Sequence, residues 1–352
     1  MKNSECFGVC CLLTITLMIG WQAGRYFDQM PIAFLNANQT RTKNVLFPFT
    51  QTIKEITPST FSQTSHSKYN FKTGVHVFRH DLTKWNADDN ICDNLPPNLK
   101  KATLHTAHGD TPIYVHNPSE DIHVSGSLVR SRTWEPHLLN LMAGHLRKDP
   151  ELQFMDLGAN LGVFSLAMAK FGRQVIAVEP LSINLHRFCA SIKAGKLTEK
   201  ITIVYNALSD KRENVSLGID RRNVGGTYIV NNKNMNKVKG SSVGGQYKDI
   251  VMTAKLDDIL KIPGFDFKKV IIKMDVEGYE NFVLNGGQIF FDQVDVQAVL
   301  MEWMWQRSGN AAKEILAFYA KRGYKPYTPG SNAPLKTSLS HAWPVDVIWR
   351  KS

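Results

Sequence analysis

The segment that most constrains the fold is residues 154–165, which read Phe-Met-Asp-Leu-Gly-Ala-Asn-Leu-Gly-Val-Phe-Ser. The apolar residues around Asp156 predict a short buried strand, and Gly158 and Gly162 predict a tight turn that leads into a helix. Glycine has no Cβ, so the backbone can approach a ligand closely at these two positions. The first N–H groups of the following helix have no partner within it and point toward whatever occupies the turn. The segment therefore predicts an α/β sheet with a ligand site at this turn.

A second apolar run, residues 175–178, ends at Glu179. A strand-end carboxylate about 20 residues beyond the glycine turn is how an open α/β sheet holds the hydroxyls of a ribose. The spacing is not G-x-G-x-x-G, which disfavours a nicotinamide or flavin site, and no G-x-x-x-x-G-K-[ST] loop for a nucleoside triphosphate is present. The pattern D-x-G-x-N-x-G followed by a strand-end Glu is typical of Rossmann-like enzymes that use S-adenosylmethionine. The alternative is a glycine turn in an ordinary βαβ unit.

A third parallel strand is expected at residues 201–205, followed by Asn206 and Ser209. Polar groups at that strand end lie where the edge of an adenine would be read. The predicted fold class is thus α/β, a doubly wound, mostly parallel Rossmann-like sheet. The candidate cofactor-binding residues share a place at the ends of these strands: Asp156, Gly158, Asn160, Gly162, Glu179, Asn206 and Ser209.

Carboxylates also follow another continuous apolar run, residues 270–274. Ligands bind outside the carboxyl ends of parallel strands, which places Asp275 and Glu277 at the cleft. Alkylation of a hydroxyl requires removal of its proton, and a positioned carboxylate, or a divalent metal held by carboxylates, can do this. The less favoured alternative for Asp275 is a cap on a helix over residues 279–284, and Lys273 could equally be a buried ion-pair partner. Glu302, at the end of the strand expected at residues 298–302, is a third catalytic candidate; metal dependence stays open.

Together, residues 154–180, 206–210 and 256–259 and the element Lys273-Met-Asp-Val-Glu-Gly-Tyr-Glu resemble FkbM-type S-adenosylmethionine-dependent methyltransferases. The resemblance covers roughly residues 104–349, and the K-x-D-V-E-G-Y-E element is its specific part. It implies O-methylation of hydroxyls on small molecules or sugars, and a seven-stranded sheet whose last strand is antiparallel. It also implies that Asp275 and Glu277 face the reacting groups. The residues that it implies line the cofactor pocket are Asp156, Gly158, Asn160, Gly162 and Glu179. The stretch before Asp249 looks longer than the family core needs.

Other segments carry weaker expectations. Residues 113–115 and 122–124 look like short strands around a turn. Residues 218–245 are rich in Gly, Asn, Lys and Ser, a composition that predicts a lid over the substrate or a surface insertion rather than core. Trp303, Trp305 and Trp343 cluster with His341 near strand ends, where flat aromatic rings could stack on sugars or simply pack.

The N-terminus contains an uncharged, mostly apolar run at residues 7–21 between Lys2 and Arg25. As a helix it spans roughly 22 Å, close to the bilayer core once its flanks are included. Trp21 disfavours a signal-peptidase site, so an uncleaved signal anchor is preferred to a cleaved signal peptide. The expected organisation is a stub and anchor at 1–27, a polar stem and lead-in at 28–95, and the methyltransferase domain at 96–352.

Sequons at Asn38 and Asn214 favour a lumenal body, which predicts a single-pass type II membrane glycoprotein of the secretory pathway, in the Golgi or the endoplasmic reticulum. Beyond residues 1–27 the chain has two cysteines, Cys92 and Cys189, which can pair in an oxidising compartment or remain as buried thiols.

The net charge of +11 suggests an acidic partner, such as anionic glycans, membrane headgroups or nucleic acid. The sequence shows no basic groove interleaved with aromatics, which makes nucleic acid the least favoured of these. The predicted function is that of a membrane-anchored O-methyltransferase whose acceptor is a hydroxylated small molecule or glycan. The net charge of the chain suggests that this acceptor is anionic. The alternative is a catalytically inactive cofactor- or glycan-binding protein with the same anchor.

Overall fold

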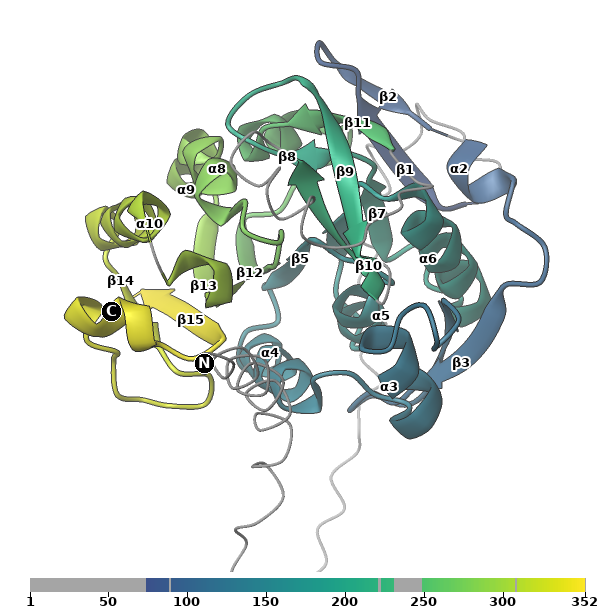
Figure 1. Ribbon diagram of the computed structural model, residues 1–352, viewed down its shortest axis with the longest axis horizontal. Coiled ribbons are helices and arrows are strands. Elements are labelled where there is room, and N and C mark those ends of the chain that lie inside the picture. Colours follow the sequence, from purple (N-terminus) through teal and green to yellow (C-terminus); the bar gives the residue numbers. More distant parts are fainter. Residues whose placement is uncertain (1–73, 89, 221–222, 231–248, 308, 352) are drawn as a thin grey trace, which may run out of the picture. The chain divides into compact units, whose positions relative to one another are not determined.

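The computed structural model describes residues 74–88, 90–220, 223–230, 249–307 and 309–351 (Figure 1). The expected anchor at residues 7–21, most of the stem and the sequon at Asn38 lie outside the described residues. Within the described ranges, no helix has both the length and the apolar character needed to cross a bilayer.

The main sheet has nine strands in the order β14-β15-β13-β12-β5-β6-β7-β1-β2 (Figure 1). β15 runs antiparallel to β13 and β14, β2 runs antiparallel to β1, and the other neighbouring pairs are parallel. The strands are β1 (His76–His80), β2 (Trp85–Ala87), β5 (Gln153–Leu157), β6 (Val175–Val178), β7 (Ile201–Val204), β12 (Lys269–Met274), β13 (Asp295–Glu302), β14 (Tyr324–Tyr327) and β15 (Asp346–Lys351). This is a mostly parallel Rossmann-like sheet, as the sequence predicts.

Two strands extend the sheet beyond the seven that the family resemblance implies. β1 pairs in parallel with β7, His76 opposite Thr202, and β2 returns antiparallel to β1. Both strands lie within residues 28–95, the range expected to be stem and lead-in. In the structure the sheet begins at His76. The apolar side chains of Val77 and Phe78 explain this, because pairing with β7 buries both of them.

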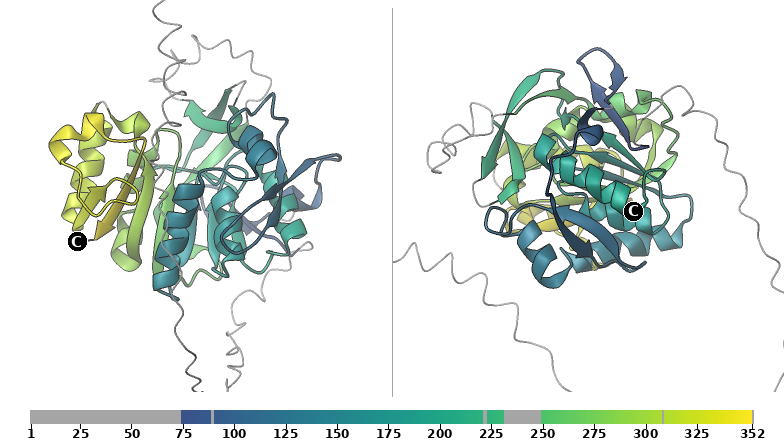
Figure 2. Two further views of the ribbon diagram at one scale, coloured as in Figure 1. Left: turned by 90° about the horizontal axis from the view of Figure 1, so that it is seen from below. Right: turned by 90° about the vertical axis from the view of Figure 1, so that its right-hand side faces the viewer.

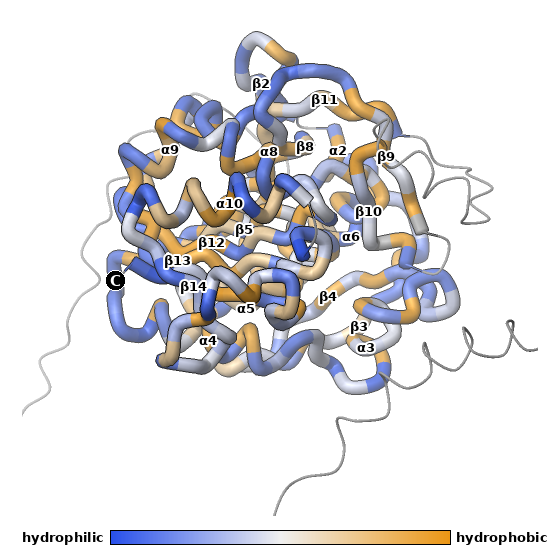
Figure 3. The backbone as a smooth tube through the Cα atoms, turned by 60° about the vertical axis from the view of Figure 1, so that its left-hand side comes forward, coloured by the Kyte–Doolittle hydropathy of each residue, from blue (hydrophilic) through white to orange (hydrophobic). Residues whose placement is uncertain are grey.

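The central strands are apolar on both faces, as expected for a parallel sheet that is covered on both sides. Successive side chains point to opposite faces, so Phe154 and Ile271 enter one hydrophobic core while Met155 and Ile272 enter the other. Figure 3 shows orange, hydrophobic stretches along these inner strands, with blue, hydrophilic residues along much of the outer part of the chain.

Helices cover both faces of this sheet (Figure 2). Helices α3 to α6 and the hairpin β3-β4 contribute to one core, and α8 to α10 contribute to the other. The covering elements on the first face are α3 (Val124–Ser131), α4 (Pro136–Lys148), α5 (Val163–Lys170), α6 (Ser182–Gly195), β3 (Lys100–Leu104) and β4 (Thr111–Val115). On the second face they are α8 (Glu280–Asn285), α9 (Gln288–Gln293) and α10 (Asn310–Lys321). Three 3-10 helices are η2 (Leu256–Lys261), η3 (Met304–Gln306) and η4 (Thr337–Ala342).

A second, four-stranded sheet lies beside the main one and corrects one sequence expectation. Its order is β10-β9-β11-β8, with β8 (Ala207–Leu208), β9 (Asn214–Asp220), β10 (Asn223–Val230) and β11 (Ile250–Ala254). Residues 218–245 were expected to hold no core, yet Ile219 and Ile229 are buried in a small cluster with Leu181. The glycines and asparagines obscured the alternating apolar positions of an antiparallel pair. Residues 231–248 lie outside the described residues.

The expected strand at residues 122–124 is wrong, because helix α3 begins at Val124. Asp121 explains the difference: its carboxylate accepts hydrogen bonds from the backbone N–H groups of Val124 (3.2 Å) and Ser125 (2.9 Å). These are N–H groups that a helix start leaves without a partner, and a carboxylate is well suited to receive them. The cap outweighs the strand preference of the β-branched residues Ile122 and Val124.

A disulfide joins Cys92 to Cys189, with the two Cα atoms 5.3 Å apart and 97 residues between them in sequence. It ties the short helix α2 (Asn90–Asp93) to α6, and both cysteines are buried. Of the two possibilities that the sequence leaves open, the structure has the bonded pair.

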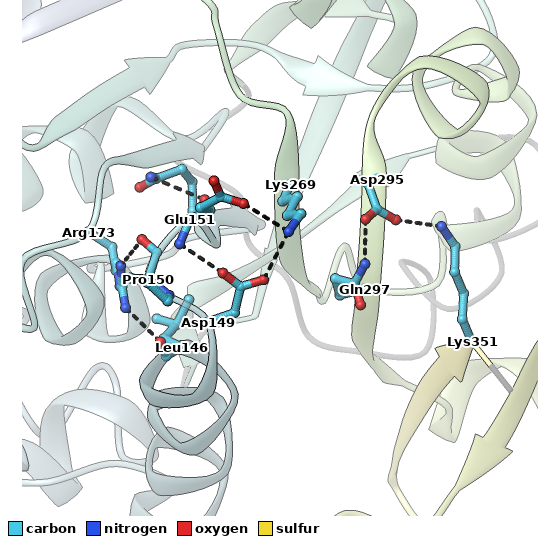
Figure 4. A network of polar contacts seen from close by, with 10 residues as sticks. Leu146, Asp149, Pro150, Glu151, Arg173, Lys269, Asp295, Gln297 and Lys351 are labelled. Atoms are coloured by element: carbon cyan, nitrogen blue, oxygen red, sulfur yellow. Dashed lines mark hydrogen bonds and ion pairs between the residues drawn. The ribbon is translucent and has the colours of Figure 1, made fainter.

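A polar network holds the amino ends of β12 and β13 (Figure 4). Lys269 Nζ donates hydrogen bonds to the carboxylates of Glu151 (2.9 Å) and Asp149 (3.3 Å). Lys351 Nζ donates a hydrogen bond to the carboxylate of Asp295 (2.7 Å). Exposed ion pairs of this kind contribute little to stability, about 0–1 kcal/mol each. Their position defines the amino edge of the sheet, opposite to the edge where the strand-end acids gather.

Candidate active site

The two motifs that the sequence singles out meet in space. A Cβ placed on Gly158 would lie 1.8 Å from the backbone carbonyl oxygen of Asp275, so only glycine fits there. The N–H of Asp275 donates to the Leu157 carbonyl (2.9 Å), and Lys273 Nζ reaches the Gly158 carbonyl (3.3 Å). The turn after β5 and the turn after β12 therefore form one structural unit.

A cavity of about 380 Å³ opens at the carboxyl ends of the parallel strands. From the sequence-predicted site residues, it brings together Gly158, Asn160, Glu179, Asn206, Asp275, Glu277 and Glu302. Neighbouring strands contribute them in spatial order, since β6, β5, β12 and β13 lie side by side. The cavity thus has a β6–β5 end and a β12–β13 end.

At the β6–β5 end, Glu179 holds the glycine turn. Its carboxylate accepts the backbone N–H of Asn160 (2.7 Å) and of Leu181 (2.9 Å). Burial raises the pKa of Glu179 to about 7, against these hydrogen bonds, which lower it. Asn160 has a positive φ of 54°, a conformation that non-glycine residues rarely adopt, and it holds this conformation directly beside the cavity.

A chain of two buried hydrogen bonds links Glu179 to Asn184 and Asn184 to His116. Asn184 Nδ2 donates to the Glu179 carboxylate (3.2 Å), and Asn184 Oδ1 lies 2.7 Å from Nε2 of His116. The amide oxygen accepts, so this nitrogen of His116 carries the proton. Burial and the nearby Arg187 lower the pKa of His116 to about 4, which keeps the ring neutral at physiological pH. Sequence reasoning missed both Asn184 and His116.

Three predicted cofactor residues lie outside the cavity lining. Asp156 is fully buried and accepts the N–H (3.0 Å) and the hydroxyl (2.7 Å) of Ser165, so it caps helix α5. Gly162 packs against the ring of Phe188, and a Cβ on Gly162 would lie 2.1 Å from that ring. Ser209 is buried and bonds to Asp210 (3.2 Å).

Asn206 lines the cavity, but its side chain is occupied. Its Oδ1 accepts the N–H of His80 (2.7 Å), and its Nδ2 donates to the carbonyls of His80 and Met252 (3.0 Å each). It joins the ends of β1 and β7 to the middle of β11, and the interactions it makes are those of a structural bridge.

At the β12–β13 end, Lys273 and Asp275 form an ion pair with Nζ and Oδ2 3.0 Å apart. Burial alone would lower the pKa of Lys273, but the charges of Asp275 and Asp156 raise it above its usual range. The lysine thus stays charged inside the protein. The sequence alternative that Lys273 is a buried ion-pair partner is confirmed, and Asp275 makes this pair while facing the cavity.

The turn after Asp275 is held in an unusual backbone conformation. Glu277 and Gly278 have φ values of 55° and 93°. Buried Glu280 stabilises the turn by accepting the N–H groups of Val276 (3.1 Å) and Gly278 (3.3 Å), and it also receives the amide of Gln306. Burial raises the pKa of Glu280 to about 7.

Further carboxyl groups gather around this turn. Burial, followed by the charge of Asp275, raises the pKa of both Glu277 and Glu302. Glu302 stands directly opposite Asp346 in the β13–β15 pair, and its Oε2 has no hydrogen-bond partner among the described residues. Burial and Asp275 raise the pKa of Asp346 to about 6.

Glu135 is a site residue that the sequence does not mark as one. It lines the cavity from the start of α4, with φ at 46°, and burial raises its pKa to about 7 although Lys273 opposes this. Its only sequence signal is the dipeptide Glu135-Pro136, a common helix start. The hairpin β9-β10 contributes further lining residues, among them Asn223 and Thr227.

The tryptophans expected near these strand ends differ in burial. Trp303 and Trp343 are buried and pack against each other with ring centroids 4.9 Å apart, so they are core residues; Trp305 is 40% exposed. Among the described residues, no group of three or more His, Cys, Asp or Glu has a geometry that would hold a metal ion.

Comparisons with known proteins agree with this site. The sequence model described as "Methyltransferase FkbM domain" matches residues 156–326. Curated proteins give no significant match. Similar solved structures include a SAM-dependent methyltransferase from Agrobacterium tumefaciens (10% identity, 78% of this chain and 76% of that chain covered, TM-score 0.39). Another is an O-methyltransferase from Bacillus cereus in complex with SAH (10% identity, 65% and 86% covered, TM-score 0.36).

At TM-scores below 0.5, these likenesses establish neither the reaction nor the acceptor of this chain. The family match coincides with the segment that holds both chemical motifs, from Asp156 through the turn at Glu277. Residues 156–326 of the chain therefore form a methyltransferase domain of the FkbM family.

Proposed function

We propose that the protein is an O-methyltransferase that transfers the methyl group of S-adenosylmethionine to a hydroxyl of a glycan or other small hydroxylated acceptor. The observation that carries the proposal is the junction of Gly158 with Asp275, which puts a nucleoside-type turn and an ion-paired carboxylate in one cavity. Adjacent strands lie about 4.8 Å apart. A ligand in front of β6 and β5 therefore has its far end close to the acid that follows β12.

Each group at the β6–β5 end has a suitable role in this reaction. The carboxylate of Glu179 accepts hydrogen bonds from the two ribose hydroxyls, while its bonds to the turn at Asn160 keep it in place. Gly158 lets the donor approach the backbone without a Cβ in the way. When bound, the donor supplies an electrophilic methyl group on a sulfonium.

At the other end, Asp275 receives the proton of the acceptor hydroxyl as the C–O bond forms and the S–C bond breaks. The sulfur keeps the electron pair, so the donor leaves as a neutral thioether and all charges balance. Lys273, 3.0 Å from Asp275, fixes the orientation of the carboxylate before the acceptor arrives. The rate gain comes mainly from holding hydroxyl, methyl and sulfur in line, with the carboxylate assisting.

Glu277 and Glu302 act as hydrogen-bonding groups for the acceptor in this proposal. Their raised pKa values favour the protonated form, which donates a hydrogen bond as well as accepting one. Each hydroxyl group of an acceptor can in turn donate a hydrogen bond and accept one. Metal dependence is left to experiment, by assay with and without EDTA.

The cellular address is a separate part of the proposal: a single-pass membrane protein with its catalytic domain in the lumen of the secretory pathway. The Cys92–Cys189 disulfide supports an oxidising compartment, and the sequon residue Asn214 is exposed on β9. Protease protection of microsomes tests the address. A catalytic domain that is digested without detergent would overturn it.

The activity is tested by two measurements on the full-length protein. Isothermal titration with S-adenosylmethionine measures donor binding, and transfer of a tritiated methyl group to a panel of glycans, lipids and small alcohols measures turnover. Binding with turnover supports the proposal. Binding without turnover on any acceptor would instead favour the alternative of an inactive cofactor-binding protein.

A further inference from the structure

The charge of the cavity contrasts with the charge of the chain. The whole chain carries a net charge of +11, which by itself suggests an anionic partner. The described lining of the cavity has the opposite composition, with five carboxylic side chains against one lysine and one histidine. Charge summed over the sequence is a poor guide here, because binding depends on the local field where the acceptor sits.

The position of the acceptor follows from the strand order. The proposed ribose acid, Glu179, ends β6, and Glu302 ends β13, three strands away or about 14 Å. With the nucleoside before β6 and β5 and the methyl group near Asp275, the acceptor lies before β12 and β13. The carboxyl groups of Glu135, Glu277 and Glu302 line this end of the cavity.

The only cation lining this end, within the described residues, is already committed. Lys273 is ion-paired to Asp275 and also bonds the Gly158 carbonyl. An anionic acceptor would therefore meet several acids, and no described residue at this end offers it a free counter-charge. An uncharged hydroxyl meets groups that both donate and accept hydrogen bonds, including the Glu302 Oε2 that no described residue satisfies.

The rim adds an aromatic surface beside these acids. Trp305 is 40% exposed, follows the lining residue Met304, and lies over Gly278, with its Cβ 3.4 Å from the position of a Cβ on that glycine. It also hydrogen-bonds the side chain of Glu277. An indole ring offers a flat apolar face with a polar edge, which matches the C–H face and the hydroxyl edge of a pyranose ring.

We propose, resting on the proposed function, that the acceptor is uncharged where it meets β12 and β13, a neutral sugar or similar polyol, and that Glu302 with Asp346 excludes anionic acceptors. Asp346 acts from the neighbouring strand β15, directly opposite Glu302. Trp305 supplies the stacking face. Glu302 and Asp346 thus determine which acceptors bind, whereas Asp275 takes the proton of the acceptor hydroxyl.

The test compares matched acceptors with the full-length protein. Transfer of a tritiated methyl group is measured on a methyl glucoside against the corresponding glucuronide, on a galactoside against its 6-sulfate, and on a cyclohexanediol against its carboxylate. In each pair of which the protein methylates at least one member, we expect kcat/KM to be at least about 10-fold higher for the neutral member. Equal or better use of the anionic member would overturn the inference.

Variants then assign the discrimination to the named residues. The double variant Glu302→Gln/Asp346→Asn removes the negative charge of Asp346 and keeps position 302 neutral, with little change in shape. It should reduce the neutral-to-anionic ratio of kcat/KM about 10-fold while the Kd for S-adenosylmethionine stays unchanged. Asp266→Asn, an exposed change before the amino end of β12, is the matched control and should leave the ratio as it is. An unchanged ratio in the double variant, with normal donor binding, would contradict the assigned role.

The two proposals fail in different ways. If the protein binds no S-adenosylmethionine, or transfers no methyl group to any member of any pair or of the wider panel, the proposed function fails and this inference with it. If methyl transfer occurs without regard to acceptor charge, the proposed function stands and only this inference is overturned.

Discussion

The backbone carbonyl oxygen of Asp275 lies 1.8 Å from the position that a Cβ on Gly158 would occupy. The residue that opens the nucleoside turn and the residue proposed to take the acceptor proton are thus packed backbone to backbone. Their contact explains why two motifs more than 100 residues apart in sequence constrain each other. Neither turn can move without displacing the other.

Gly158→Ala should abolish S-adenosylmethionine binding and destabilise the fold by about 3 kcal/mol or more, because the new methyl group overlaps a backbone atom that cannot turn away. Gly172→Ala is the matched control, since Gly172 also has positive φ (98°) but nothing within 4 Å of its Cβ position. It should cost only about 1 kcal/mol, the strain of the backbone conformation. Thermal unfolding and titration calorimetry measure both; equal effects of the two variants would contradict the close-approach argument.

Glu179→Gln should weaken binding of 5′-methylthioadenosine at least about 10-fold, because the ribose diol loses its carboxylate acceptor. Binding of the 2′-deoxy analogue should fall less, since that ligand lacks one of the hydroxyls. Calorimetry with both ligands separates recognition of the ribose from a general loosening of the turn at Asn160. If both ligands lose affinity equally, Glu179 has only the structural role that its bonds to Asn160 and Leu181 already show.

Glu280→Gln tests the buried acid behind the catalytic turn. The pKa of Glu280 is raised from an ordinary 4.5 to about 7, so the folded state keeps a proton that the unfolded state releases. Stability from this group is complete below pH 4.5 and is lost as pH rises to about 7, by at most about 3 kcal/mol. The variant keeps the neutral shape and should therefore become progressively more stable than wild type from pH 5 to pH 8.

Urea unfolding at several pH values measures this difference, with the exposed Glu199→Gln as control. A constant difference between Glu280→Gln and wild type across that range would show that Glu280 is ionised in the folded protein.

Reduction of the Cys92–Cys189 disulfide should destabilise the domain by about 2–5 kcal/mol, since the bond closes a loop of 97 residues and so restricts the unfolded chain. Urea unfolding with and without dithiothreitol measures the effect on one and the same sequence. The double variant Cys92→Ala/Cys189→Ala should not respond to the reductant. Identical midpoints for oxidised and reduced wild type would contradict a stabilising role.

Much of the core fold was predictable because its signals are local. The apolar runs before Asp156, Glu179 and Asp275 each end in an acid, and each became a parallel strand with its acid at the carboxyl edge. Hydrophobic continuity gives the strand, and the fixed direction of a parallel sheet gives the edge.

The parts that were missed depend on tertiary context. Asn206 was expected at an adenine; it lines the cavity, and its amide bonds to His80 in β1 and Met252 in β11, which only the folded chain brings together. Asp156 was expected to contact the ligand, and it caps α5 from within the core. Glu135 and Asp346 join the acid cluster from α4 and β15, and nothing in their local sequence distinguishes them from surface acids.

The hairpin β9-β10 was misjudged for a different reason. Its glycines and asparagines suggested a surface insertion, yet Leu217 and Ile229 alternate with them and face a small core. Antiparallel pairing needs only every second side chain to be apolar, so average composition hides it.

The central claim is that Asp275 assists methyl transfer from a donor bound beside it. The most direct test measures tritiated methyl transfer and donor Kd for wild type and Asp275→Asn, with the exposed Asp292→Asn as control. We predict at least a 100-fold loss of kcat in Asp275→Asn, the usual range for removal of a general base, with the Kd for S-adenosylmethionine within about 3-fold of wild type. Full turnover by Asp275→Asn with normal donor binding would contradict the account.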